Sequence, residues 1–178
     1  MPLGKGPIEH FNFAGAGWFP DSRRIAFIGN EPGHGPRCYA QDIQGGTPRP
    51  ITKEGIMYCM IAPNGLIAAM TPDSRLLLYS SVSTDQPEKE FILKSNEWPL
   101  RWTPNGQFIY ISQPHERTVD LWRLEVATGR REFWMQLPPG SGNAYVKSES
   151  VVVSPDARSY AYTYDEHSSD LYEVRGLK

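Results

Sequence analysis

The sequence predicts an all-β protein built from repeated units of about four strands, and three observations support this class. A proline-centred phrase occurs four times along the 178 residues, and β-forming residues alternate after each copy. No window of 11 or more residues shows the period of an amphipathic helix. The chain also holds 16 glycines and 16 prolines, which suits short strands joined by tight turns.

The repeated phrase is aligned by Pro20, Pro63, Pro104 and Pro155, which are 43, 41 and 51 residues apart. Each anchor follows an apolar residue two positions earlier and precedes Asp or Asn and then a small residue. Proline presets φ for the first central position of a turn, and Asp or Asn can bond to the backbone two residues later. Each phrase therefore predicts two strands joined by a tight turn.

Apolar pairs follow each anchor at the fifth and seventh positions, which predicts a strand with one packed face. These pairs are Ile25 and Phe27, Ala68 and Met70, Ile109 and Ile111, and Tyr160 and Tyr162. One further tetrapeptide, TPDS at 71–74, breaks the spacing. It predicts an extra hairpin turn within the second unit.

Each unit continues with a third strand, and the first three units continue with a fourth. The third strands are expected at 37–44, 75–82, 119–126 and 169–176, and the outer strands at 47–52, 88–93 and 131–137. Four-stranded units of about 40 residues are typical of β-propeller blades. The predicted blades span 14–52, 56–93, 98–137 and 144–178.

The ends of the chain raise the question of how such a ring would close. The fourth unit lacks an outer strand, whereas residues 7–13 supply one strand too many, so we expect this segment to close the last blade. A half-ring would expose two apolar blade faces. We therefore expect a head-to-tail homodimer with eight blades, in which residues 7–13 of each chain complete the final blade of the other. A small four-bladed ring is the alternative.

Two units carry the residues of a known repeat. The stretches WFPDSRRIAFIGN…CYAQDIQGGTPRPIT and RWTPNGQFIYI…LWRLEVATGRREFW resemble the TolB-type, WD-like β-propeller repeat. NEPGHGPR, EWPLRWTPNG and the ending SPDARSYAYTYDEHSSDLYEVRGLK further resemble propellers fused behind bacterial serine/threonine protein kinase domains. The resemblance implies a sensor or docking portion, because these residues contain no Gly-rich nucleotide loop, H-R-D or D-F-G motif.

Composition argues against several classes of partner. Charge is nearly balanced, with 18 Lys and Arg against 20 Asp and Glu, so no nucleic-acid partner is expected. The residues contain no signal-peptide pattern and no run of about 18 apolar residues, so no membrane insertion is expected and the compartment stays open. Cys38 and Cys59 lie in apolar, strand-like runs, which predicts two buried free thiols.

No motif in the sequence indicates catalysis. HERTVD at 115–120 departs from the H-E-x-x-H zinc motif after two letters, and no G-x-S-x-G elbow occurs. We therefore expect a non-catalytic chain without cofactor or metal. The leading hypothesis is a binding module for a protein or peptide partner, which rests on family analogy. The alternative is a propeller portion that gates or completes a hydrolase or small-molecule-binding site.

Residues of the loops between second and third strands, together with Trp98, are the candidates for a binding face. His34, His115 and His167 follow their anchors at similar distances and are expected on a common rim. Imidazole can bind metal or titrate near neutral pH, but the blades separate these three, so contact with a partner is favoured. The complete set of candidates is His34, Arg37, His115, Arg117, His167 and Trp98.

The tryptophans divide into two groups. Trp18 and Trp102 occupy equivalent positions two residues before an anchor, so we expect both to pack between blades. Trp98 and Trp134 lie closer to a loop or an outer strand and are expected nearer the surface.

Overall fold

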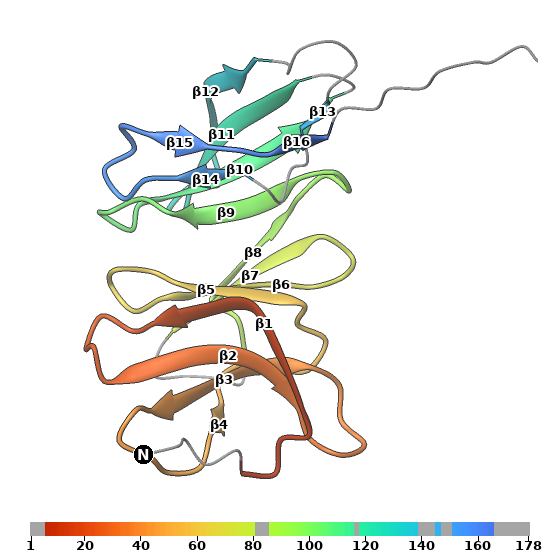
Figure 1. Ribbon diagram of the computed structural model, residues 1–178, viewed down its shortest axis with the longest axis vertical. Coiled ribbons are helices and arrows are strands. Elements are labelled where there is room, and N and C mark those ends of the chain that lie inside the picture. Colours follow the sequence, from red (N-terminus) through yellow and green to blue (C-terminus); the bar gives the residue numbers. More distant parts are fainter. Residues whose placement is uncertain (1–5, 81–85, 116–117, 139–144, 147–150, 166–178) are drawn as a thin grey trace, which may run out of the picture.

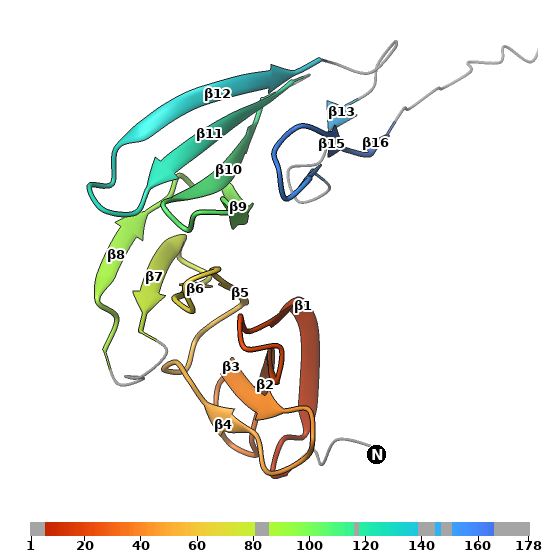
Figure 2. The ribbon, with the colours of Figure 1, turned by 90° about the vertical axis from the view of Figure 1, so that its left-hand side faces the viewer.

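The computed structural model describes residues 6–80, 86–115, 118–138, 145–146 and 151–165. They form three antiparallel four-stranded sheets and two short strand pairs. The sheets stack into an open arc with the inner strands β1, β5 and β9 on one side and the outer strands β8 and β12 on the other (Figures 1 and 2). The predicted fold class, all-β with propeller-like blades, is confirmed. The described residues contain no helix long and apolar enough to cross a membrane.

Each four-stranded sheet follows the order of the chain from its inner to its outer strand. Blade 1 consists of β1 (His10–Trp18), β2 (Arg24–Asn30), β3 (Arg37–Asp42) and β4 (Arg49–Pro50). Blade 2 consists of β5 (Tyr58–Ile61), β6 (Ile67–Met70), β7 (Arg75–Tyr79) and β8 (Lys89–Ile92). Blade 3 consists of β9 (Trp98–Trp102), β10 (Phe108–Pro114), β11 (Val119–Glu125) and β12 (Arg131–Leu137).

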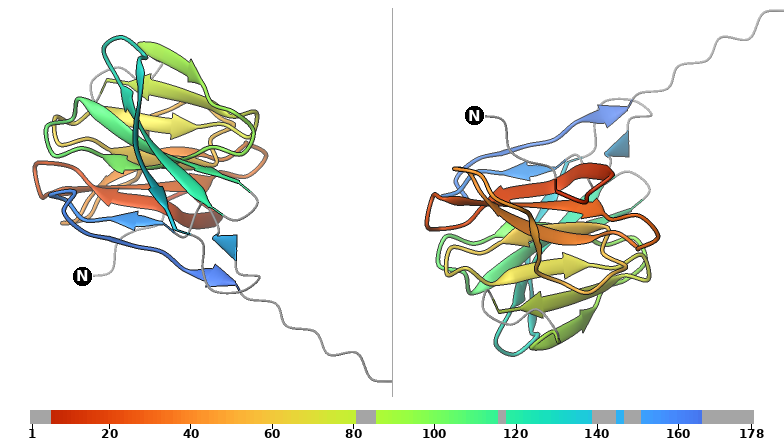
Figure 3. Two further views of the ribbon diagram at one scale, coloured as in Figure 1. Left: turned by 90° about the horizontal axis from the view of Figure 1, so that it is seen from above. Right: turned by 90° about the horizontal axis from the view of Figure 1, so that it is seen from below.

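The last unit is described in part. β14 (Val152–Val153) pairs with β15 (Tyr160–Ala161), and β13 (Tyr145–Val146) pairs with β16 (Tyr164–Asp165). The strand predicted at 169–176 lies outside the described residues. Seen from above and from below, the sheets are rotated relative to one another, as stacked blades are (Figure 3).

The anchored turns and the TPDS turn share one geometry. In each, the second residue after proline donates its N–H to the carbonyl of the residue before proline, at 2.9–3.1 Å. This donor residue has positive φ in all five turns: Ser22, Gly65, Ser74, Gly106 and Ala157. Left-handed backbone favours glycine and explains why small residues follow Asp or Asn. TPDS joins β6 to β7, as predicted.

Turn carboxylates and amides complete these turns. Asp21 accepts hydrogen bonds from the N–H of Arg23 and Arg24. The bond from the Arg23 N–H, followed by that from the Arg24 side chain, lowers the pKa of Asp21 to about 2. Asn105 and Asp156 accept the corresponding bonds in their turns. The Asp or Asn residues therefore have a structural role.

The second unit differs from the predicted alignment by one residue. Trp18 lies opposite Ile25 and Trp102 opposite Ile109, seven residues on in both cases, whereas Ile61 lies opposite Ile67. The turn after β5 is one residue shorter. The Ala62 N–H donates to the carbonyl of Leu66, whereas in blade 3 the equivalent Thr103 N–H reaches one residue further, to the carbonyl of Phe108. A shift of one residue moves a strand's side chains to the other face. Ala68 and Met70 consequently pack toward blade 3.

Three apolar clusters lie between consecutive blades. The cluster between blades 1 and 2 includes Ala26, Ile28, Ile67 and Tyr79. The cluster between blades 2 and 3 includes Met70, Leu78, Trp102 and Ile109. Val119, Leu121, Leu137 and Val151 join blade 3 to the last unit. Each described sheet is thus held by burial of apolar surface against its neighbour.

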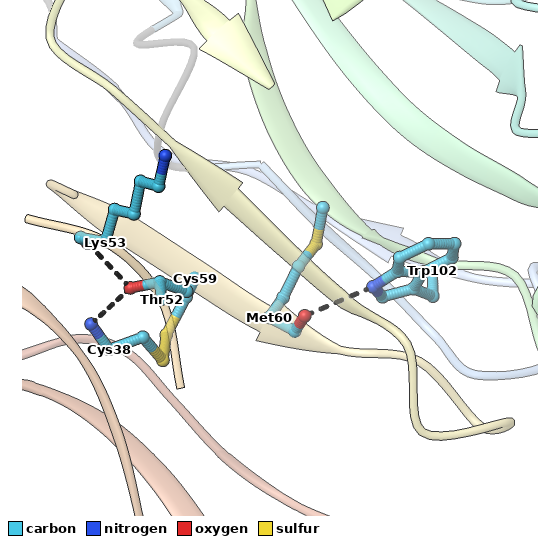
Figure 4. Close-up of a disulfide and its surroundings, with 6 residues drawn as sticks. All are labelled: Cys38, Thr52, Lys53, Cys59, Met60 and Trp102. Atoms are coloured by element: carbon cyan, nitrogen blue, oxygen red, sulfur yellow. Dashed lines mark hydrogen bonds between the residues drawn. A yellow bond between two sulfur atoms is a disulfide. The ribbon is translucent and has the colours of Figure 1, made fainter. Parts of the chain in front are cut away.

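A disulfide joins Cys38 in β3 to Cys59 in β5, so the prediction of two free thiols was wrong (Figure 4). Both residues are fully buried, and their Cα atoms are 6.6 Å apart. Thr52, in the connection between blades 1 and 2, accepts the Cys38 N–H at 2.9 Å. The pairing depends on how this connection places one blade against the next, which the spacing of two cysteines does not reveal.

The N-terminal segment also differs from the prediction. Residues 10–13 belong to β1, where His10 pairs with Asn30 and Asn12 with Ile28. A shift in register between Asn12 and Gly17 lets one strand follow the length of β2. Residues 10–13 therefore pair locally with the adjacent strand of blade 1 rather than with the last blade. Ile8 precedes them and is buried against Phe27 and Tyr39.

Candidate functional site

A groove of about 390 Å³ lies where inner strands of blades 2 and 3 approach the turn of the last unit. It is lined by Met60, Ile61, Pro63, Leu100, Arg101, Trp102, Pro104 and Pro155. Its position follows from the repeat, since the anchored turns lie at one end of the blades, on the left of Figure 1. Three anchor prolines, separated by 41 and 51 residues, therefore meet at one surface.

Among the described residues that line the groove, Arg101 alone is charged. Its side chain is half-buried; Nη1 donates to the Val153 carbonyl at 2.6 Å and Nε to the Trp102 carbonyl at 3.3 Å. These two bonds hold the guanidinium between blade 3 and the last unit. No carboxylate of the described residues forms an ion pair with it. The remaining N–H groups of this guanidinium can donate charge-assisted hydrogen bonds to an anionic group.

Trp102 forms an apolar wall of the groove. Its ring is 4 % exposed, and Nε1 donates to the Met60 carbonyl of blade 2 at 3.4 Å (Figure 4). The prediction that Trp102 packs between blades is confirmed. The ring is packed in the apolar cluster between blades 2 and 3 and is hydrogen-bonded to blade 2, so this wall of the groove is preformed.

His34 lies at the end of the blades opposite the anchored turns and is exposed. Its Nδ1 is 2.7 Å from Oε1 of Glu54, and the Gly35 N–H donates to Oε2 at 2.9 Å. The Gly35 N–H and then His34 lower the pKa of Glu54. The pair ties the β2–β3 loop to the connection that leads into blade 2.

Arg37 forms a compact network at the same end of blade 1. Its Nη2 is 2.8 Å from Glu31, and its Nε donates to the Tyr39 hydroxyl at 2.9 Å. The bonds from Arg37 and then Tyr39 lower the pKa of Glu31. The charge of Arg37 is thus balanced within blade 1.

His115 and Trp98 belong to blade 3. His115 Nε2 is 2.9 Å from Asp120, whose second carboxylate oxygen accepts a bond from Gln136. Trp98 is half-buried and tilts against Tyr58, with ring centroids 5.3 Å apart. Arg117 and His167 lie outside the described residues.

None of the residues that line the groove is among the candidates predicted for a binding face. Arg101 precedes Trp102 in the third repeat, and strand alternation puts neighbouring side chains on opposite faces. That signal was available, but it could not show that Pro104 and Pro155 lie beside it. The predicted candidates His34, Arg37, His115 and Trp98 lie at the other ends of the strands, away from this groove.

Comparison with known proteins places the fold. No protein-family model matches the chain, and no curated protein has significant sequence similarity to it. TolB from Acinetobacter baumannii matches 90 % of this chain with a TM-score of 0.61 and 18 % identity. A putative TolB from Agrobacterium tumefaciens matches 85 % with a TM-score of 0.57 and 19 % identity, and the Dos1 propeller matches 86 % with 0.55 and 15 %.

The fold is similar to that of TolB. At these identities the likeness shows the propeller fold alone. It agrees with the propeller fold that the sequence resemblance to the TolB-type repeat implies. The matches cover 39 % of the Acinetobacter TolB and Dos1 chains and 53 % of the Agrobacterium chain. The chain therefore spans about two fifths to one half of the solved propeller proteins it resembles.

Proposed function

We propose that this chain is a non-catalytic binding module whose groove receives an extended segment of a protein or peptide partner. The observation that carries the proposal is the Arg101 guanidinium, held at the edge of a groove with apolar and proline walls. Binding sites typically combine such walls with a few placed polar groups. No nucleophile or general base is among the described residues that line the groove.

The lining indicates the chemistry of the segment. Exposed Pro63, Pro104 and Pro155 offer rigid apolar surface to an extended chain. A carboxylate on that chain, from an acidic side chain or a C-terminus, would complement Arg101. The resemblance of the sequence to kinase-fused propellers supports placing this module in a signalling protein.

The test is a binding screen with fluorescein-labelled hexapeptides rich in proline and apolar residues, made with free carboxylate or amidated C-termini. We expect carboxylate peptides to bind, and Arg101→Gln to weaken them about tenfold or more, since a charge-assisted hydrogen bond contributes about 1.5–3 kcal/mol. Arg49→Gln is the matched control, because Arg49 is exposed on β4 of blade 1.

Equal binding by wild type and Arg101→Gln would contradict the assignment of the groove. A reproducible hydrolysis of ester or peptide substrates, lost on a single side-chain substitution, would contradict the non-catalytic role.

A further inference from the structure

β5 is the strand that joins the disulfide to the groove. Its side chains alternate between two interfaces: Cys59 is buried in the cluster between blades 1 and 2, and Met60 in the cluster between blades 2 and 3. Met60 and Ile61, the two residues that follow Cys59, both line the groove. Figure 4 shows the disulfide on one side of this strand and Trp102 on the other.

The repeat position of Trp102 shows what β5 contributes to the groove. Trp18 occupies the same position in blade 1 but is 61 % exposed, so the prediction that it packs between blades was wrong. Among the described residues no blade precedes blade 1, whereas β5 lies against Trp102 and accepts its Nε1–H at the Met60 carbonyl. That bond is 3.4 Å long, beyond the usual range of about 2.7–3.2 Å, so a small displacement of β5 breaks it.

Few backbone bonds hold β5 in place. The strand is four residues long and pairs on one side only, with β6. The connection before it is anchored to β3, because the Ile51 N–H donates to the Cys38 carbonyl and Thr52 accepts the Cys38 N–H. Apart from the chain itself, the disulfide is the covalent tie that fixes β5 against blade 1.

We propose that the Cys38–Cys59 disulfide is a positioning element of the groove, so that the chain binds its partner segment in the oxidised form and loses affinity when the bond is reduced. This inference rests on the proposed function of the groove. With the disulfide intact, Met60 and Ile61 stay beside Trp102 and the groove keeps its shape. After reduction β5 moves relative to β3 and the Met60 carbonyl leaves the indole, while the apolar cluster between blades 2 and 3 stays packed.

The reductant is a dithiol. Its thiolate attacks one sulfur of the disulfide to form a mixed disulfide, which its second thiol then displaces. Two electrons and two protons pass from the dithiol to Cys38 and Cys59, which become thiols, and the reductant becomes a disulfide. Both cysteines are fully buried, so attack requires local opening of the connection between blades 1 and 2. The groove therefore responds to sustained reducing conditions rather than to brief exposure.

Exchange of the Trp102 indole proton with solvent reports the position of β5 without any ligand. NMR of isotope-labelled protein compares three forms: oxidised, reduced with dithiothreitol, and carrying both Cys38→Ala and Cys59→Ala. Trp102→Phe assigns the signal by its loss. Trp134→Phe does the same for Trp134, which packs between blade 3 and the last unit. We expect exchange at Trp102 to be at least tenfold faster in both disulfide-free forms and exchange at Trp134 to be unchanged.

Affinity for the carboxylate hexapeptides tests the consequence for binding. Both disulfide-free forms should bind them at least tenfold more weakly than the oxidised chain. Ile28→Ala is the matched control, because Ile28 is buried in the same interface while the disulfide stays in place. It should lower stability without changing the exchange at Trp102 or the affinity.

Several outcomes would overturn the proposal: equal exchange at Trp102 in all forms, equal acceleration at Trp102 and Trp134, equal affinity with and without the disulfide, or the same changes in Ile28→Ala. A disulfide-free chain that loses its strand content by circular dichroism at every temperature would also overturn it, because the groove would then be lost by unfolding. Peptides that bind no form would contradict the proposed function, and exchange at Trp102 would still decide whether the disulfide positions β5.

Discussion

The interface between blades 1 and 2 and the interface between blades 2 and 3 are closed by different chemistry. The first is built around a disulfide, Cys38–Cys59, and contains aliphatic side chains together with Phe19 and Tyr79. The second is built around Trp102 and contains polar bridges. Among these, Arg131 binds Glu97 at 2.6 and 2.9 Å, and Lys89 donates to the carbonyls of Val126 and Ala127.

The difference shows what a repeat does and does not specify. In both interfaces the inner-strand residue two positions before the anchor faces the preceding blade, although the turn that follows is one residue shorter in blade 2. The residues that seal them, such as Cys59 and Glu97, lie outside the repeated phrase. The same arrangement of strands is therefore compatible with a disulfide in one interface and a partly buried ion pair in the other.

The largest effect is expected at the repeat position two residues before the anchor proline, which is Trp102 in one interface and Ile61 in the other. Trp102→Ala should lower the free energy of unfolding by about 3–5 kcal/mol, because it leaves a large cavity between blades 2 and 3. Ile61→Ala, the matched change between blades 1 and 2, should cost about 1–2 kcal/mol, since Ile61 is half-buried. Urea unfolding measures both. Equal costs would mean that the two interfaces do not differ in this respect.

Reduction of the disulfide should weaken the first interface alone. The bond links residues 21 apart, and its loss should cost about 2–4 kcal/mol. Hydrogen exchange should accelerate in β3 and β5 before β10 and β11. A chain with Cys38→Ala and Cys59→Ala should not respond to reductant. Free thiols found by titration of unreduced, denatured protein would contradict the bond.

Removal of the partly buried ion pair between Arg131 and Glu97 should weaken the second interface. Arg131→Met leaves the Glu97 carboxylate, whose side chain is 1 % exposed, without its cation. We expect a loss of about 2 kcal/mol, below the cost of a fully buried pair because Arg131 is partly exposed. Adding Glu97→Gln should recover part of this loss. Arg130→Met is the control, since Arg130 pairs with Glu132 while largely exposed; an equal loss there would contradict the prediction.

The smallest effects are expected in the anchored turns. Gly106 has φ of 67°, and a Cβ there would lie 3.4 Å from the Asn64 side chain of blade 2. Gly106→Ala should therefore cost about 1 kcal/mol. Ser22→Gly, at φ of 54° in blade 1, should raise the melting temperature slightly. A stabilising Gly106→Ala would show that turn geometry does not limit stability at this contact.

Much of the fold could be predicted from the residues because the signals are local. Proline followed by Asp or Asn and a small residue defines a turn that closes within four residues, and the structure has it at all five places. Alternating β-formers around Ile25 and Ile109 define strands with a packed face. The all-β class with propeller-like blades follows from repetition of this unit.

Other features depended on contacts between segments far apart in the chain. The face that Ala68 and Met70 present depends on a turn one residue shorter, and the pairing of Cys38 with Cys59 depends on the path between two blades. The groove at Arg101 exists because three turns meet at one end of stacked sheets. Trp18 and Trp102 are identical in the repeat, yet one is exposed and the other buried. A repeat specifies strand, turn and register through neighbouring residues, whereas burial depends on which blade lies next to it in space.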